Sequence, residues 1–211
     1  MKLYWFWSFN PQKVRLALHE LGVAHDLVAV DLFRGQQRHA DFARLNPNKK
    51  VPVLEDGDVV VWESNAILAY LGEREGRLWP KDPSSPDNAA RRADALRWLF
   101  FEARHLGDAV GALWFSDYAG PQAGIPVDEA RRARGVTELA SALPILEAQL
   151  AKHAFVTGAE FSLVDCCYGA ALDALSLSRF DLAPYPSVNA YLARLRARPA
   201  WAKCEFRTKE A

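Results

Sequence analysis

One stretch of the sequence decides the fold: Val51-Pro52-Val53-Leu54-Glu55-Asp56-Gly57-Asp58-Val59-Val60-Val61-Trp62-Glu63-Ser64. Asp56-Gly57 lies between two β-branched runs, which is typical of the tight turn of a hairpin. Valines on both sides favour an extended backbone. Ser64 precedes an apolar run and suits the N-cap of a helix. The stretch therefore predicts two strands joined by a turn, followed by a helix.

The same stretch has two features typical of a binding site. Pro52, at the start of the first strand, lacks a donor for the strand ladder and is a candidate for a cis peptide bond. Glu63 and Ser64 place an acid and a hydroxyl at the N-terminus of a helix, where a ligand carboxylate is favoured. We therefore expect the hairpin to form part of the sheet and also to contact a ligand.

Upstream, the chain predicts a strand, a helix and a second strand. The first strand covers Leu3–Trp7, and the helix has Asn10 as its N-cap and Pro11 as its first residue. The helix ends at Gly22, a residue typical of the position after a helix, and an apolar strand follows over 25–30. This order implies a parallel strand pair with a right-handed crossover.

We expect the first segment, residues 1–76, to be a small α/β domain. A polar loop with a short helix covers 31–44, and a turn over 45–50 leads into the hairpin. Residues 77–87, rich in proline, form the expected linker. Residues 88–211 form an all-helical domain. Its expected elements are a helix over 88–115, a loop over 116–126, a helix over 127–152 with Pro144 inside it, a buried helix after the capping box of Ser162 and Asp165 that ends near 177, and a last helix over 187–198.

Composition limits the class of function. The 211 residues contain 26 Lys plus Arg and 26 Asp plus Glu, so the net charge is +0, which argues against nucleic-acid or membrane surfaces as partners. No apolar run is long enough to span a membrane. Three cysteines, two of them adjacent, do not form a disulfide framework, and they predict a cytoplasmic protein. No residue spacing typical of a metal site appears, so no metal is expected.

These motifs together resemble the cytosolic glutathione transferases, in particular the bacterial type with a Ser/Thr-x-Asn active site. The resemblance rests on the strand-helix-strand start, the Val51-Pro52 hairpin ending in Glu63-Ser64, and the capping box of Ser162. It implies a thioredoxin-like first domain that binds glutathione and a helical second domain that supplies the cosubstrate pocket. It also implies a homodimer and a small-molecule electrophile as the cosubstrate.

The resemblance assigns glutathione contacts around the hairpin. Val51 would pair its backbone with the cysteinyl part of glutathione, and a cis bond to Pro52 would expose that edge. Ser64, with the helix N-terminus, would take the γ-glutamyl carboxylate, and Glu63 would help to bind the ammonium. Lys50 would lie near the cysteinyl or glycyl end.

Near the glycyl end, the resemblance leaves alternatives open. Gln37 matches a glutamine that related bacterial members use there. Arg38 or His39 could serve the glycyl carboxylate instead. Each of these two side chains is also expected as an ordinary surface charge.

The thiol-activating residues are expected in Ser8-Phe9-Asn10. A free thiol has a pKa of about 8.5, so a hydroxyl donor and a helix N-terminus are needed to favour the thiolate. Ser8 is the candidate donor, and Asn10 could donate a second hydrogen bond or act only as an N-cap. Trp5 occupies the position of the tyrosine-type members, and no cysteine lies in the break. Two residues separate Ser8 from Pro11, whereas serine-type members usually have one.

The hydrophobic-substrate pocket is expected to contain Trp7, His105, Trp114 and Tyr118, although His105 could be a structural histidine. The expected activity is an enzymatic one, the conjugation of glutathione, as cosubstrate, to a hydrophobic electrophile. One alternative is a glutathione-dependent disulfide reductase or peroxidase. The other is a non-catalytic binding module with the same fold. Cys166 and Cys167, in an apolar helix, are expected to be core thiols.

Overall fold

A four-stranded mixed sheet organises the first half of the molecule. The computed structural model describes residues 1–80 and 86–204. The strands are β1 (Lys2–Trp5), β2 (Asp26–Ala29), β3 (Val53–Asp56) and β4 (Val59–Trp62), in the order β2-β1-β3-β4. β1 and β2 are parallel, whereas the other neighbours are antiparallel. The predicted parallel pair and the predicted hairpin, with Gly57 at φ 59°, are confirmed.

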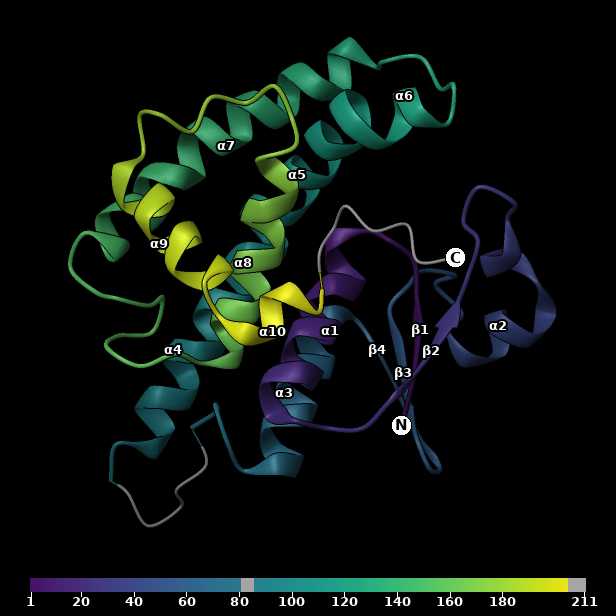
Figure 1. The fold of residues 1–211 in the computed structure, drawn as a ribbon, viewed down its shortest axis with the longest axis horizontal. Helices are drawn as coiled ribbons and strands as arrows, with labels where there is room; N and C mark the ends of the chain where they lie inside the picture. The colour runs from purple at the N-terminus through teal and green to yellow at the C-terminus, as the bar shows by residue number, and fades with distance from the viewer. Residues whose placement is uncertain (81–85, 205–211) are drawn as a thin grey trace.

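Helices cover both faces of this sheet (Figure 1). Leu3, Trp5 and Leu54 are buried on the face that carries α1 (Phe9–Leu21) and α3 (Ser64–Glu75). On the opposite face, Val53 packs with Phe42 of α2 (Ala40–Leu45), which follows the short 3-10 turn η1 (Gln36–Arg38). The alternation of buried side chains along each strand produces the two layers.

Both helices that flank the candidate site begin earlier than predicted. The N-cap of α1 is Ser8, not Asn10, because the N–H of Gln12 already donates to the Ser8 carbonyl at 3.2 Å. Pro11 is tolerated there because the first four helical N–H groups have no intrahelical partner. Glu63 at φ 70°, not Ser64, is the N-cap of α3, and Ser64 is the first helical residue.

The second half begins with one nearly continuous helical rod. It comprises α4 (Asn88–Phe101), the π-helical segment η2 (Glu102–Leu106), α5 (Gly107–Trp114), the π-helical segment η3 (Phe115–Ala119) and α6 (Gly120–Gln122). The loop predicted to begin at Ser116 was wrong, because Gly120 and Pro121 lie in the first turn of α6, where a proline N–H is not needed. The helix continues to Gln122.

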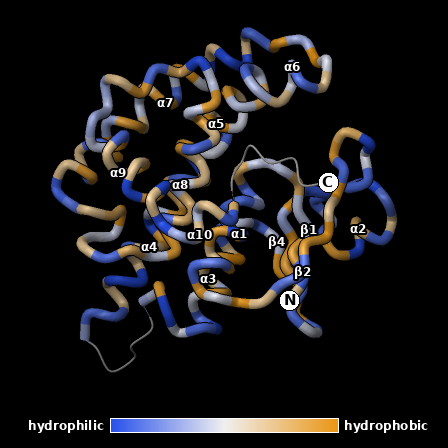
Figure 2. Tube along the Cα trace, viewed as in Figure 1, coloured by the Kyte–Doolittle hydropathy of each residue, from blue (hydrophilic) through white to orange (hydrophobic). Residues whose placement is uncertain are grey.

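Further helices pack around this rod. α7 (Glu129–Leu150) continues through Pro144, and α9 (Pro186–Arg196) ends two residues before the predicted Arg198. The helix over 187–198 was predicted to be the last one, but a short helix, α10 (Pro199–Ala202), follows it. Pro199 begins this helix, because proline suits the first turn. Figure 2 shows hydrophobic residues gathered along the strands, whereas hydrophilic residues alternate with them along α7.

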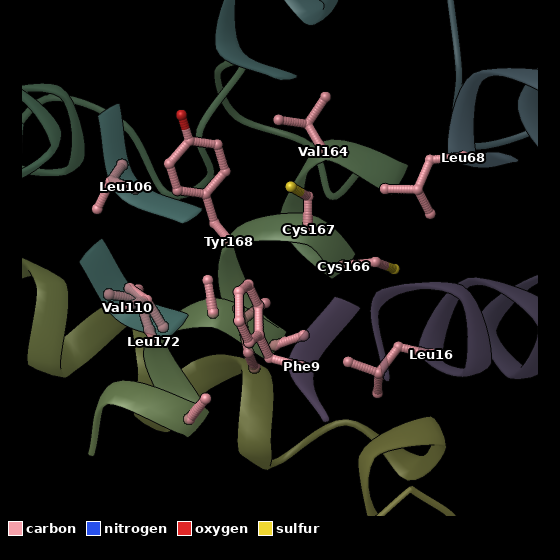
Figure 3. Close-up of a cluster of buried hydrophobic side chains, with 14 of the residues drawn as sticks. Phe9, Leu16, Leu68, Leu106, Val110, Val164, Cys166, Cys167, Tyr168 and Leu172 are labelled. Carbon is pink, nitrogen blue, oxygen red and sulfur yellow. The ribbon is translucent and has the colours of Figure 1, made fainter. Parts of the chain in front are cut away.

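The central helix α8 (Leu163–Leu175) joins the two halves and is buried along its whole length. Its predicted capping box is confirmed, with the Ser162 N–H donating to the Asp165 carboxylate at 2.8 Å. Figure 3 shows Phe9 and Leu16 of α1 in the same cluster as Cys166 and Cys167 of α8, whose sulfur atoms point in different directions. Both cysteines are buried in the core, as predicted.

The connection between the halves is described only in part. α3 ends at Glu75 and α4 begins at Asn88, and residues 81–85 of the expected linker lie outside the described residues. The Leu163 N–H donates to the Leu78 carbonyl at 2.9 Å, so the described start of this connection is tied to α8. Within the described residues, no helix is both long and apolar enough to cross a membrane.

Candidate functional site

A pocket lies where the sheet domain meets the helical rod. It contains Asn10 and five of the six predicted glutathione contacts, which come from three separate segments of the first half. The second half closes it with the start of η2 and the start of α5. The lining residues are Asn10, Lys13, Asn46, Lys50, Val51, Pro52, Glu63, Ser64, Asn65, Glu102, Ala103, Gly107 and Asp108. Folding therefore brings together most of the residues that were predicted to activate or bind glutathione.

The turn before β3 is held by a residue that sequence reasoning missed. Asn46 is 2% exposed; its side-chain amide donates to the Lys50 carbonyl at 2.7 Å, and its side-chain oxygen accepts the Asn48 N–H at 2.9 Å. The Val51–Pro52 peptide bond is cis. Asn46 thus fixes the backbone that presents Val51 to the pocket. The Asn-Pro-Asn turn was visible in the sequence, but its role as a support was not.

The N-terminus of α3 supplies an anion-binding feature with an acid beside it. The first N–H groups of a helix have no intrahelical partner and lie at the positive end of its dipole. Ser64, 8% exposed, begins α3, and exposed Glu63 precedes it. The Ser64 hydroxyl donates to the side-chain oxygen of Asn10 at 3.3 Å, which links α3 to the start of α1. A ligand with a carboxylate and an ammonium on one carbon matches this pairing.

Ser8 and Asn10 differ in their placement. Asn10 lines the pocket, and its side-chain oxygen is directed to Ser64. Ser8 is half-buried with an extended backbone at the N-terminus of α1, and it is not among the lining residues. Its hydroxyl makes no capping hydrogen bond to α1. A donor at this position, with the positive end of the α1 dipole, favours a thiolate that lies close to the N-terminus of α1.

A buried charged cluster forms the floor of the pocket. Lys13, 2% exposed, makes a salt bridge of 2.8 Å to Oε2 of Glu102, which is fully buried. The side-chain amide of Asn65 and the Cys167 thiol donate to the same oxygen at 3.1 and 3.3 Å. A helical Glu gives no sequence signal of such a role, because only the chain's folding places Glu102 against α1 and α3.

The cluster fixes the protonation of its members. Burial alone lowers the pKa of Lys13, but the charge and the hydrogen bond of Glu102 outweigh it and raise that pKa, so Lys13 is charged. Burial, together with the charge of Glu102, holds the pKa of Cys167 well above its usual value. Cys167 is therefore a neutral thiol that donates a hydrogen bond, which agrees with its predicted role in the core.

An aromatic cluster contains three of the four residues predicted for the hydrophobic pocket. The Trp7 ring lies 5.5 Å from that of Trp114 and 6.3 Å from that of Tyr118, both edge to face. Phe33, 46% exposed and missed by sequence reasoning, adds a ring at 6.2 Å from Trp7. His105 lies elsewhere, exposed and packed on Phe101 at 5.1 Å.

The predicted glycyl-end residues also lie away from the pocket lining. Gln37, on η1, donates its side-chain amide to the Leu32 carbonyl at 3.4 Å. Arg38 and His39 follow it and are exposed. All three are on the loop between β2 and α2. Among the described residues, no group of three or more His, Cys, Asp or Glu side chains is arranged to hold a metal ion.

Comparisons with known proteins agree with this architecture. The family model described as "Glutathione S-transferase, N-terminal domain" matches residues 1–73, and that of the "Glutathione S-transferase, C-terminal domain" matches residues 129–194. Glutathione S-transferase 3 from Zea mays is 34% identical, over 96% of this chain and 92% of the relative. The disulfide-bond oxidoreductase YfcG from Escherichia coli is 31% identical, over 94% and 91%.

A solved structure shares the whole fold. A glutathione transferase from Burkholderia graminis, with two glutathione molecules bound per subunit, superposes with a TM-score of 0.83 at 28% identity. The match covers 100% of this chain and 89% of the other.

Proposed function

Because the chain belongs to the glutathione S-transferase family, we propose that it conjugates the thiolate of glutathione to a hydrophobic electrophile. The observation that carries the proposal is the pocket between the two halves. It combines the backbone before β3, the N-terminus of α3 with an adjacent acid, and Asn10 at the start of α1. These are the groups that a γ-glutamyl peptide with a thiol requires.

Glutathione is bound as a short extended peptide. Val51 pairs its backbone with the cysteinyl unit, in the manner of an added β-strand. The N-terminus of α3, with Ser64, takes the γ-glutamyl carboxylate, and Glu63 takes part in binding the ammonium. Lys50 lies at the cysteinyl or glycyl end. Gln37, or Arg38 or His39, on or just after η1, serves the glycyl carboxylate.

The thiol is activated at the N-terminus of α1. Ser8 donates a hydrogen bond to the sulfur, and the positive end of the α1 dipole adds to it, so the thiolate is favoured. Asn10, whose side-chain oxygen accepts from Ser64, donates a second hydrogen bond to the sulfur from its amide N–H₂. The thiol proton leaves to water, the thiolate attacks the electrophilic carbon, a C–S bond forms, and the leaving group departs with its electron pair. Trp7, Trp114, Tyr118 and Phe33 supply the apolar surface for the electrophile.

A second candidate is a glutathione-dependent disulfide reductase. The similarity to YfcG, named a disulfide-bond oxidoreductase, favours it specifically. In this reaction the thiolate attacks one sulfur of a disulfide, expels the other as a thiolate, and a second glutathione resolves the mixed disulfide to oxidised glutathione. The third alternative is a non-catalytic binding module with this fold.

The proposal includes a cytoplasmic homodimer. Exposed apolar side chains support an association between copies: Trp62 of β4 is 41% exposed and Phe100 of α4 is 70% exposed. Sedimentation equilibrium of the purified protein tests the dimer, and a mass equal to one chain at micromolar concentration would reject it.

The decisive experiment assays the purified chain with glutathione and two substrates, 1-chloro-2,4-dinitrobenzene and hydroxyethyl disulfide. We expect turnover of the chlorinated nitroaromatic and a large loss of it in Ser8→Ala. Turnover of the disulfide alone would overturn the transferase in favour of the reductase. If neither substrate is turned over and calorimetry still detects glutathione binding, both enzymatic functions are rejected in favour of the non-catalytic binding module.

A further inference from the structure

Glu102 uses only one of its two carboxylate oxygens within the protein. Oε2 accepts from Lys13 at 2.8 Å, from Asn65 at 3.1 Å and from Cys167 at 3.3 Å. Oε1 is equally buried, yet no donor in the described part of the chain lies within hydrogen-bonding distance of it. A buried acceptor without a partner is costly and is usually satisfied by water or a ligand. Three donors on one oxygen and none on the other therefore require an explanation.

The free oxygen faces Gly107, another residue of the pocket lining. Glu102 and Gly107 both line the pocket, and a Cβ built on Gly107 would lie 3.2 Å from Oε1. Oε1 is thus directed toward the backbone of Gly107, a position at which this chain has no side chain. The π-helical segment η2, which begins at Glu102 and ends just before Gly107, sets this arrangement.

The position of Oε1 relative to α3 identifies its ligand. Asn65 is the second residue of α3, and its side chain bonds directly to Glu102. The carboxylate of Glu102 is therefore one side chain away from the helix N-terminus that attracts an anion. In an α-amino acid head group, the ammonium and the carboxylate are on the same carbon. A carboxylate at the N-terminus of α3 consequently places an ammonium within reach of the Glu102 side of the pocket.

We propose that Oε1 of Glu102 accepts a hydrogen bond from the α-ammonium of the γ-glutamyl unit of glutathione. The helical half of the chain then takes part directly in recognition of the peptide, beside Glu63 from the sheet half. Lys13 holds the carboxylate in place through its salt bridge to Oε2, which leaves Oε1 for the ligand. The inference rests on the proposed function, because it takes glutathione as the ligand of this pocket.

The test compares two ligands that differ only in the ammonium: glutathione and glutaryl-cysteinylglycine, in which a hydrogen replaces the α-amino group. Isothermal titration calorimetry measures both affinities for the wild type and for Glu102→Gln. Loss of a hydrogen bond to a charged group weakens binding by about tenfold to a hundredfold. We expect that loss for glutathione only, with the affinity for the analogue unchanged within about twofold.

Two further variants control the comparison. Glu138→Gln removes an exposed acid of α7 that lies outside the pocket lining and is expected to change neither affinity. Glu102→Gln leaves Lys13 buried without its charged partner. If this single variant does not fold, the double variant Lys13→Met with Glu102→Gln replaces it, because it removes both charges. The double variant is also expected to lose the discrimination between the two ligands. Circular dichroism verifies the fold of each variant.

The outcomes separate the inference from the function. If the wild type binds glutathione and Glu102→Gln weakens both ligands equally, or neither, the role of Glu102 is rejected while the function stands. An equal loss of discrimination in Glu138→Gln would also reject it, since a general charge effect would explain the result. If the wild type does not bind glutathione, the proposed function fails and the inference fails with it.

Discussion

Replacement of Asp165 by alanine is expected to remove a large part of the stability of the helical half. The carboxylate is 0% exposed and accepts four hydrogen bonds. The donors are the Val156 N–H at 3.0 Å, the Ser162 N–H at 2.8 Å, the Ser162 hydroxyl at 3.0 Å and the Tyr191 hydroxyl at 2.8 Å. One side chain therefore caps α8 and ties it to α9 and to the segment before α8.

The magnitude follows from the donors that alanine would leave behind. Val156 is 0% exposed and Tyr191 is 1% exposed, so water does not replace the lost acceptor, and each orphaned donor costs about 1–3 kcal/mol. Ser162 is only half-buried, and the lost cap costs about 1 kcal/mol there. Relief of the buried charge, whose burial raises the pKa of Asp165, offsets part of the sum. We expect a net loss of about 3–5 kcal/mol of unfolding free energy.

Urea unfolding, followed by circular dichroism, measures this loss, and Ser162→Ala and Tyr191→Phe are the comparators. Because 1 kcal/mol corresponds to about 2–4 °C for a chain of this length, the melting temperature of Asp165→Ala should fall by roughly 10 °C. Ser162→Ala should cost about 1 kcal/mol. If Asp165→Ala costs no more than Ser162→Ala, the argument from orphaned buried donors is wrong.

Three other predictions concern catalysis, pH and packing. Ser8→Ala should lower kcat more than it weakens glutathione binding, whereas Ser64→Ala should mainly weaken binding; equal effects in steady-state kinetics and calorimetry would refute this division. Burial raises the pKa of Glu147. Hydrogen bonds from the Ser187 side chain and from the backbone N–H groups of Ser187 and Val188, both at 2.9 Å, outweigh it and lower that pKa from its ordinary value of 4.5. The resulting stability is present above about pH 4.5 and is lost as the pH falls through the lower folded value, so in urea unfolding at several pH values Glu147→Gln should flatten that dependence. Gly135→Ala should destabilise by about 1–3 kcal/mol in thermal unfolding, despite the helix propensity of alanine, because the new Cβ would lie 2.4 Å from the Leu113 side chain; an unchanged or higher melting temperature would contradict it.

Local patterns were sufficient where a few neighbouring residues decide the backbone. Asp56-Gly57 predicted the hairpin turn because Gly57 must adopt a positive φ, and Ser162 with Asp165 predicted the start of α8 because the two groups satisfy each other. The prediction of the N-cap failed at α1, where two suitable residues lie close together in the sequence. Asn10 suits an N-cap as well as Ser8 does, and only the carbonyl-to-Gln12 hydrogen bond distinguishes them.

Gly120 and Pro121 show the same limit in the helical half. Both residues usually interrupt a helix, and the sequence predicted a loop. In the folded chain, the preceding π-helical segment η3 carries the backbone directly into α6, where proline occupies the first turn. Packing and the hydrogen bonds of the preceding turn override the local preference there.

The sequence by itself determined the fold class and the hairpin, because both depend on residues that are near neighbours in the chain. Val51, Pro52, Glu63 and Ser64 lie on that hairpin or at its ends, and all four line the pocket. Only the tertiary structure decided which distant side chains complete the pocket. It placed Glu102 beside Lys13, 89 residues away, left Gln37 outside the pocket lining, and packed His105 on Phe101. A helical glutamate has the same local pattern on a surface as in a core, so its burial, its pairing and its free oxygen depend on contacts that no local pattern encodes.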